Sequence, residues 1–132
     1  MVRTGKKRDI LGKVVLATIE GDIHDIGKTL VGTMMSASGF EVFDMGVDVP
    51  IMKIVEKARE VGADIVGVSA LLTTTMAKQK DVIEALEDSG MESVKVMVGG
   101  APVDQSFADE VGADGYAPDA STATILAKSL FN

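Results

Sequence analysis

The sequence predicts an α/β fold built on one doubly wound, five-stranded parallel sheet. Short runs of β-branched and aliphatic residues alternate with longer segments of helical composition. The runs are continuously apolar rather than alternating with polar residues, which is typical of parallel strands buried on both faces. The length of 132 residues fits one domain with one core.

Five strand–helix units follow one another along the chain. We expect strands at KVVLAT (13–18), EVFDMG (41–46), DIVGVSA (64–70), VKVMVGG (94–100) and near Gly115. We expect helices at 27–38, 51–61, about 75–88, about 105–111 and from Ser121 onward. The pentapeptide EVGAD occurs at 60–64 and again at 110–114, where its glycine would cap a helix before the next strand. This order of units predicts a flavodoxin-like, Rossmann-like sheet with strand order 2-1-3-4-5 and right-handed crossovers.

Composition narrows the class of function. The net charge is −7, and the basic residues at 3–8 form no pattern, so a nucleic-acid partner is not expected. No apolar run approaches the roughly 20 residues that span a bilayer, and no signal-peptide pattern opens the chain, so we expect a cytoplasmic protein without a membrane partner. Cysteine is absent, which excludes disulfides and thiolate metal sites.

The polar and glycine-rich segments come directly after the strands. They are GDIHDIGK at 21–28, SALLTTT at 69–75, GGAP at 99–102 and YAPD at 116–119. Ligands of doubly wound sheets bind outside the carboxyl ends of the strands, where the strand order reverses. For the predicted order this point lies between the first and third strands, so these loops are expected to form one site.

His24 is the only histidine of the chain. A lone histidine is more often a surface or structural residue than a ligand, but this one leaves the first strand with Asp22 two residues before it. In an extended segment the two side chains project to the same side, so the carboxylate can hold the Nδ1 proton and prepare Nε2 for a metal. One imidazole is a poor set for a free cation, which takes three or four protein ligands. The metal is therefore expected to arrive already held by a macrocycle.

These motifs resemble those of cobalamin-binding domains. GDIHDIG contains the Asp-x-His-x-x-Gly pattern, and the fuller TIEGDIHDIGK at 18–28 is similar to the methyltransferase branch, which includes methionine synthase and the small corrinoid proteins of methylamine, methanol and aryl-ether methyl transfer. Ser69-x-Leu71 with Thr73, then Gly99-Gly100, then Tyr116-x-x-x-Ala120 resemble the family's later motifs in order. The resemblance covers nearly everything from Lys13 onward, and four motifs in register are far more specific than one.

The resemblance implies a cobalamin or related corrinoid whose nucleotide tail leaves cobalt while His24 becomes the lower axial ligand and the metal-binding residue. Asp22 would hold His24. Thr75 would complete a relay that takes up or releases a proton as cobalt changes oxidation state, which makes Asp22, His24 and Thr75 the predicted catalytic residues.

The other roles concern the tail. Ser69 and Thr73 would bond its base, and Gly27, Gly99 and Gly100 would leave room for it; a helix cap and a simple turn are the alternatives for the threonines and the paired glycines. The full predicted cofactor-binding set is Gly21, Asp22, Ile23, His24, Asp25, Ile26, Gly27, Ser69, Leu71, Thr73, Thr75, Gly99, Gly100, Ala101, Tyr116 and Ala117.

By this likeness the domain at 13–132 carries a methyl group on cobalt between a substrate-specific methyltransferase and a methyl-acceptor methyltransferase, with a reductive activase as a further candidate partner. It is not expected to be a catalyst alone. Residues 1–12 are interpreted as a linker or the tail of a missing N-terminal helical cap. The alternatives are a small subunit of an adenosylcobalamin mutase and a cobalamin-based sensor. A phosphoreceiver domain is disfavoured because Ser69 and Tyr116 stand where it needs an acidic residue and a lysine, and a flavodoxin-like electron carrier because its phosphate loop is absent.

Overall fold

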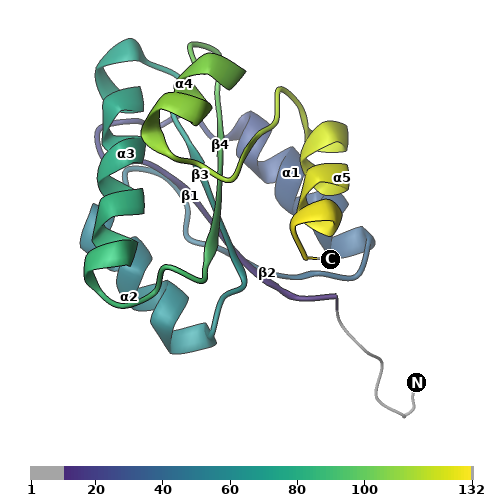
Figure 1. Cartoon of the computed structure of the whole chain (residues 1–132). Helices are drawn as coiled ribbons and strands as arrows, with labels where there is room; N and C mark the ends of the chain where they lie inside the picture. The colour runs from purple at the N-terminus through teal and green to yellow at the C-terminus, as the bar shows by residue number, and fades with distance from the viewer. Residues whose placement is uncertain (1–10, 132) are drawn as a thin grey trace, which may run out of the picture.

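The computed structural model describes residues 11–131, and within them strands and helices alternate along the chain (Figure 1). The strands are β1 (Lys13–Thr18), β2 (Glu41–Asp44), β3 (Ile65–Ser69), β4 (Lys95–Gly99) and β5 (Gly115–Tyr116). The helices are α1 (Ile26–Ala37), α2 (Ile51–Val61), α3 (Thr73–Asp88), α4 (Gln105–Val111) and α5 (Ala120–Phe131). All strand pairs are parallel, in the order β2-β1-β3-β4-β5. The predicted fold class and strand order are confirmed.

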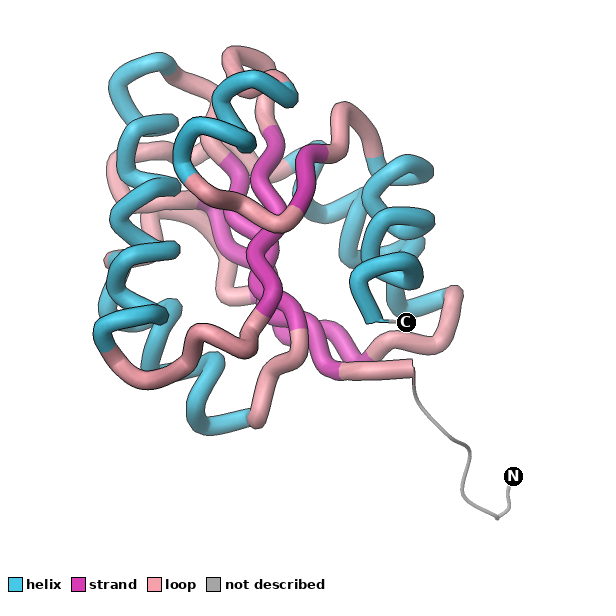
Figure 2. The backbone as a smooth tube through the Cα atoms, in the orientation of Figure 1, coloured by secondary structure: helices cyan, strands magenta, loops and turns pink. Residues whose placement is uncertain are grey.

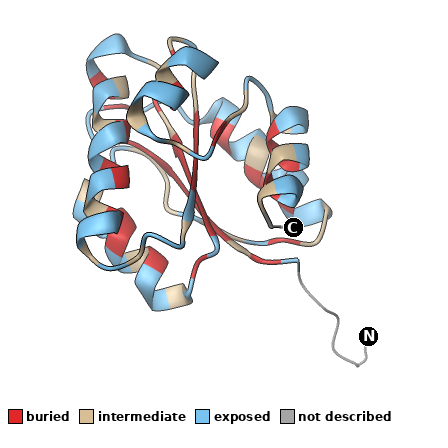
Figure 3. Ribbon diagram, in the orientation of Figure 1, coloured by how far each residue is buried: buried red, intermediate tan, exposed pale blue. Residues whose placement is uncertain are grey.

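Helices cover both faces of the sheet. Figure 2 shows α2, α3 and α4 on one side of the magenta strands and α1 and α5 on the other. Val15 and Ala17 of β1 belong to the larger apolar cluster with α2 and α3, whereas Val14 and Leu16 belong to the smaller cluster with α1 and α5. Each buried valine or leucine contributes roughly 1.5–3 kcal/mol. Figure 3 shows the buried residues gathered in the strands and on the inward faces of the helices, which explains the continuous apolar runs.

The element boundaries differ from the expected ones by a few residues. Strand β2 ends at Asp44 rather than at position 46, because the Asp44 carboxylate accepts the N–H of Gly46 at 2.9 Å and turns the chain. Helix α3 begins at Thr73, since the carbonyl of Leu72 already accepts the N–H of Met76 at 3.0 Å. The glycines of the two EVGAD copies cap α2 and α4 in the left-handed conformation, with φ of 69° and 83°.

The expectation of a linker or cap tail at 1–12 falls almost wholly outside the described residues. Of that segment, Leu11 donates to the carbonyl of Gly39 at 2.9 Å, and the carbonyl of Gly12 accepts the N–H of Glu41 at 2.9 Å. These bonds align the entry to β1 with the entry to β2. Among the described residues, no helix combines the length and the apolar character needed to cross a membrane.

Candidate functional site

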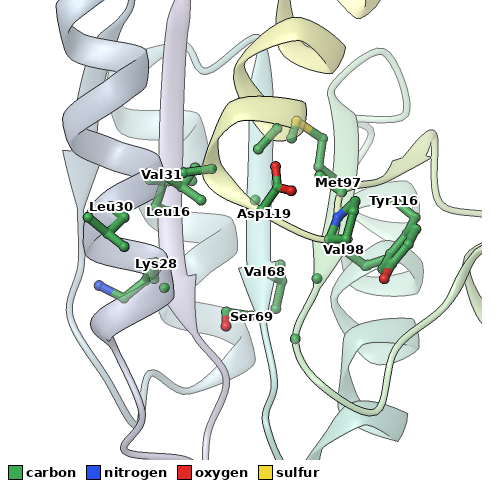
Figure 4. A pocket seen from close by; sticks show the side chains of 18 of the residues that line it. Leu16, Lys28, Leu30, Val31, Val68, Ser69, Met97, Val98, Tyr116 and Asp119 are labelled. Carbon is green, nitrogen blue, oxygen red and sulfur yellow. The ribbon is translucent and has the colours of Figure 1, made fainter.

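A cavity of about 530 Å³ opens at the carboxyl edge of the sheet, between α1 and α5 (Figure 4). Nine of the predicted cofactor-binding residues line it: His24, Gly27, Ser69, Leu71, Gly99, Gly100, Ala101, Tyr116 and Ala117. They come from the segment that follows β1 and from the last residues of β3, β4 and β5 with the segments after them, so the fold brings together parts of the chain that are distant in sequence. The lining is mostly apolar, which is the usual character of a small-molecule site.

Glycines in the strands leave the space open. Gly67 of β3 lies beside Leu16, and a Cβ at Gly67 would come within 2.7 Å of the Leu16 Cδ2 atom. A Cβ at Gly99 of β4 would come within 3.1 Å of the carbonyl oxygen of Ala117. Figure 4 shows Leu16, Val31 and Met97 around the apolar part of this cavity and Ser69 near its opening. Larger residues at Gly67 and Gly99 would therefore fill the floor.

The carboxylate of Asp22 is buried beside the cavity, with 1% of the residue exposed, and it accepts four hydrogen bonds. Its Oδ1 atom lies 2.7 Å from Nδ1 of His24 and 3.1 Å from the backbone nitrogen of the same residue. Its Oδ2 atom lies 2.7 Å from the backbone nitrogen of Leu71 and 2.8 Å from the hydroxyl of Thr75. One side chain thus joins the segment after β1 to the start of α3.

Two opposing effects act on the pKa of Asp22. Burial alone would raise it, but the bonds from His24, Leu71 and Thr75 favour the charged form and together hold the pKa of Asp22 well below its ordinary value. The carboxylate is therefore ionised at neutral pH. An ionised carboxylate can only accept, so the Nδ1 atom of His24 is the donor of the 2.7 Å contact and the Nε2 lone pair of the neutral ring is left free.

His24 stands at the mouth of the cavity with half of its side chain exposed. Its carbonyl accepts the hydroxyl proton of Thr18, which is fully buried, at 2.9 Å. Backbone and ring are thus fixed by separate bonds, while the free Nε2 atom can bind one coordination position of a metal. Within residues 11–131 no group of three or more His, Cys, Asp or Glu side chains is arranged to hold a metal ion.

Several predicted site residues lie outside the cavity lining. Ile23 and Ile26 are 74% and 78% exposed, and Thr73 is an exposed residue at the start of α3. Gly21 and Asp25 flank Asp22 and His24 in the same loop. Asp22 and Thr75 do not line the cavity, but Asp22 bonds two residues that do, His24 and Leu71.

Gly100, the residue directly after β4, is required by the fold itself. A Cβ at Gly100 would lie 1.7 Å from the carbonyl oxygen of Ala70, and the φ of Gly100 is +124°, so only glycine lets the two loops approach this closely. A Cβ at Gly27, by contrast, would have no atom within 4 Å. Space for a ligand therefore adjoins Gly27, whereas Gly100 has a structural reason independent of any ligand.

Twelve further lining residues were not in the predicted cofactor-binding set, although four of them, Lys28, Pro118, Asp119 and Ala120, belong to the predicted loops and motifs. The twelve are Leu16, Lys28, Leu30, Val31, Gly67, Val68, Met97, Val98, Pro118, Asp119, Ala120 and Ala123. Gly67 could have been predicted from the sequence, because a glycine inside a buried strand often marks a close approach of another group. Lys28 is buried and pairs with Asp44 at the end of β2, so its carbon chain lines the cavity while its ammonium contacts the carboxylate. The sequence alone does not predict which face of the sheet is covered by α1 and α5.

Comparison with known proteins places the chain in a family. The model of the B12 binding domain matches residues 12–125. The dimethylamine corrinoid protein 2 of Methanosarcina acetivorans is 58% identical over 127 residues, which cover 96% of this chain and 59% of that protein.

Two solved structures are similar as well. The monomethylamine corrinoid protein of Methanosarcina barkeri is 42% identical with a TM-score of 0.84, over 89% of this chain and 57% of that one. The methanol:cobalamin methyltransferase complex of Methanosarcina barkeri is 32% identical with a TM-score of 0.89, over 97% of this chain and 49% of the other. The chain thus spans about half to three-fifths of the length of these relatives.

Proposed function

The chain belongs to the B12-binding family of corrinoid proteins, and from this premise we propose that it is a methyl carrier. It receives a methyl group from a methyltransferase that holds the substrate and presents that group to a second methyltransferase that holds the acceptor. The corrinoid supplies the chemistry, since its cobalt can accept and release a methyl group. The protein supplies the binding site, the axial donor and the surface that both partners meet.

A single observation carries this proposal: the sole histidine stands at the mouth of an apolar cavity with its Nδ1 proton held by a buried carboxylate. A corrinoid ring already provides four nitrogens to its cobalt, so the protein needs to supply only one donor atom. The free Nε2 atom of His24 can be that donor. A cavity of about 530 Å³ with glycine at positions 67 and 99 has room for the displaced tail. The residues present therefore fit a corrinoid.

Each residue of the site has a proposed task. His24 would supply the donor nitrogen that holds the corrinoid cobalt, and Asp22 keeps its ring in the tautomer with Nε2 free. Thr75 donates to Asp22 and takes part in holding or moving the proton of that pair. Ser69 and Tyr116 line the cavity, and each carries a hydroxyl group that can bond the tail.

The partners follow from the relatives. One relative is a dimethylamine corrinoid protein and one belongs to a methanol:cobalamin methyltransferase complex. We therefore propose a methylamine-class substrate, a methyltransferase specific for it, a methyl-acceptor methyltransferase and a reductive activase as partners, all of them in the cytoplasm. We further propose that 13–132 is the corrinoid-binding domain and that 1–12 is a connecting segment.

Cofactor binding is tested with two probes. Aquacobinamide lacks the nucleotide tail, so it has no lower base of its own, whereas hydroxocobalamin has one. We expect wild-type protein to bind both with the visible spectrum of an imidazole-ligated corrinoid, and to bind hydroxocobalamin more tightly because the tail enters the cavity. His24→Ala should leave bound cobinamide with the spectrum of its aqua form. Glu20→Ala, which removes an exposed carboxylate from the loop that follows β1, is the matched control and should keep the imidazole spectrum.

Carriage is tested separately. Reduced, corrinoid-loaded protein is mixed with dimethylamine that carries radiolabelled methyl groups and a dimethylamine methyltransferase. We expect label on the protein fraction with wild type and none with His24→Ala. Tight corrinoid binding without any transfer of label, from dimethylamine, monomethylamine or methanol, would favour the sensor alternative over the carrier.

A further inference from the structure

The segment at 45–49, which follows β2, lies against the loop that carries His24. The N–H of Thr18 donates to the carbonyl of Gly46 at 3.0 Å, and the N–H of Val49 donates to the carbonyl of Thr18 at 3.0 Å. An isolated parallel bridge joins Ile19 to Val49. The pairing of β1 with β2 therefore continues past the ends of both strands and reaches the histidine loop from its outer side.

Asp48 makes two contacts that bracket the Gly21–Asp22 part of the histidine loop. Its carboxylate Oδ1 accepts the N–H of Gly21 at 2.8 Å, and its own N–H donates to the carbonyl of Asp22 at 2.9 Å. Two bonds from a single residue thus hold the backbone before the Cα atom of Gly21 and after the Cα atom of Asp22. The Asp22 side chain, meanwhile, is held by Leu71 and Thr75 from the β3 side.

The backbone of Asp48 is itself unusual. Its φ is +54°, and no other non-glycine residue within 11–131 has a positive φ. Side chains with a Cβ rarely adopt this conformation, although Asp and Asn tolerate it best. Residues held in sparsely populated conformations gather at functional sites, where the surroundings fix them. Here the conformation lets the side chain and the N–H of Asp48 point to the same neighbouring loop.

We propose that Asp48 is a positioning residue for the axial histidine. It fixes the Gly21–Asp22 backbone, and through the Asp22 carboxylate it fixes the ring tautomer and the place of His24. Asp48 does not line the cavity, so it acts without touching the cofactor. This inference rests on the proposed role of His24 as the corrinoid ligand.

The expected effect follows from the bonds that each substitution removes. Asp48→Asn keeps an acceptor for Gly21 and a side chain suited to positive φ, so it should behave like the wild type. Asp48→Gly keeps the backbone conformation but removes the acceptor, and an exposed bond of this kind is worth roughly fivefold in the equilibrium that it supports. Asp48→Ala removes the acceptor and disfavours the backbone conformation, so it should weaken the site further.

The matched control is Asp64→Ala. Asp64 is also exposed, and its carboxylate accepts the N–H of Lys13 at 2.9 Å, a bond of the same type at the opposite edge of the sheet. Its loss should lower stability without any effect on the histidine.

Two measurements on the full chain test the proposal. In cobalamin-free protein, nitrogen NMR of the single imidazole reports its tautomer at a pH where the ring is neutral. We expect Asp48→Gly and Asp48→Ala to move the ring nitrogens from the Nδ1–H pattern toward the average of a free imidazole, and Asp48→Asn and Asp64→Ala to stay with the wild type. In titrations with aquacobinamide, the imidazole-ligated fraction should fall in the same order, by about fivefold in the ligation constant for Asp48→Gly.

The proposal is overturned if Asp48→Gly matches the wild type in both measurements. It is equally overturned if Asp48→Asn is as weak as Asp48→Ala, or if Asp64→Ala shifts the ring nitrogens as much as Asp48→Gly does. A wild-type protein that shows no imidazole ligation at all would refute the proposed function instead, and the NMR of the cobalamin-free chain would still decide whether Asp48 positions His24.

Discussion

Asp22→Asn is the substitution with the sharpest expected outcome, because the carboxylate accepts four hydrogen bonds and donates none. An amide of the same shape presents one oxygen and one NH₂ group. If the oxygen keeps the bonds from Leu71 and Thr75, the NH₂ group faces the backbone N–H and the ring of His24. The ring can respond by accepting at Nδ1, which transfers its proton to Nε2, the atom proposed to bind cobalt.

The size of the effect follows from the bonds that are lost. The part-buried backbone N–H of His24 loses its acceptor, which costs roughly 1–3 kcal/mol. We therefore expect Asp22→Asn to lower the free energy of unfolding by about 2 kcal/mol at neutral pH and to abolish imidazole ligation of bound cobinamide.

The pH dependence has a definite sign. The folded-state pKa of Asp22 is lowered below its unfolded value of about 3.9, so the stabilisation is fully present above that pH and is lost as the pH falls toward the folded value. Asparagine does not titrate. The stability difference between wild type and Asp22→Asn should therefore be largest at about pH 7 and shrink as the pH falls below about 4.

Urea denaturation of the cobalamin-free proteins, followed by circular dichroism across this pH range, measures the difference directly. A difference that stays constant down to about pH 3 would refute the reasoning, because the stabilisation would then not depend on the charge of Asp22. Equal stability at neutral pH would refute it as well.

Two pairs of substitutions extend the test to the cavity wall. Gly100→Ala should fail to fold or lose at least about 3 kcal/mol of the free energy of unfolding, since its Cβ would overlap the carbonyl of Ala70. Gly27→Ala should raise the free energy of unfolding by about 0.5–1 kcal/mol, because alanine has the higher helix propensity. Urea denaturation that ranks the two variants the other way round would contradict the structure. Asp44→Ala should lower the free energy of unfolding by about 2 kcal/mol, because it leaves the buried ammonium of Lys28 without a partner. Lys28→Met should stay within about 1 kcal/mol of the wild type in the same measurement. Equal losses for the two variants would mean that water replaces Asp44 as the partner of Lys28.

Much of the fold was predictable because both faces of the sheet are covered. Continuous apolar runs at 13–18 and 64–70 can bury side chains on both sides only as central parallel strands, and the structure pairs them. The ends of elements were less predictable. Helix α3 starts two residues before the expected position because backbone hydrogen bonds to the carbonyl of Leu72 form its first turn. These bonds involve backbone atoms only, so the side-chain composition does not reveal them.

The candidate site also has features that the sequence predicts and features that it does not. The spacing of Asp22 and His24 predicts the contact between the carboxylate and the ring, because two residues in an extended segment project to one side, and the 2.7 Å distance fits that expectation. Most of the cavity floor could not be predicted, since Leu16 and Met97 line it only because α1 and α5 cover their face of the sheet. The proposed role of Asp48 also depends on its positive φ, which cannot be predicted from the sequence.

The axial bond itself can be observed through the nitrogen nucleus that forms it. The protein is prepared with ¹⁵N only in histidine, loaded with hydroxocobalamin and reduced to the paramagnetic Co(II) form, whose electron paramagnetic resonance lines are split by one axial nitrogen. Because the chain has one histidine, ligation by His24 predicts that labelling converts each triplet into a doublet. A triplet that survives labelling would show that the unlabelled base of the cofactor still occupies cobalt, and it would contradict ligation by His24.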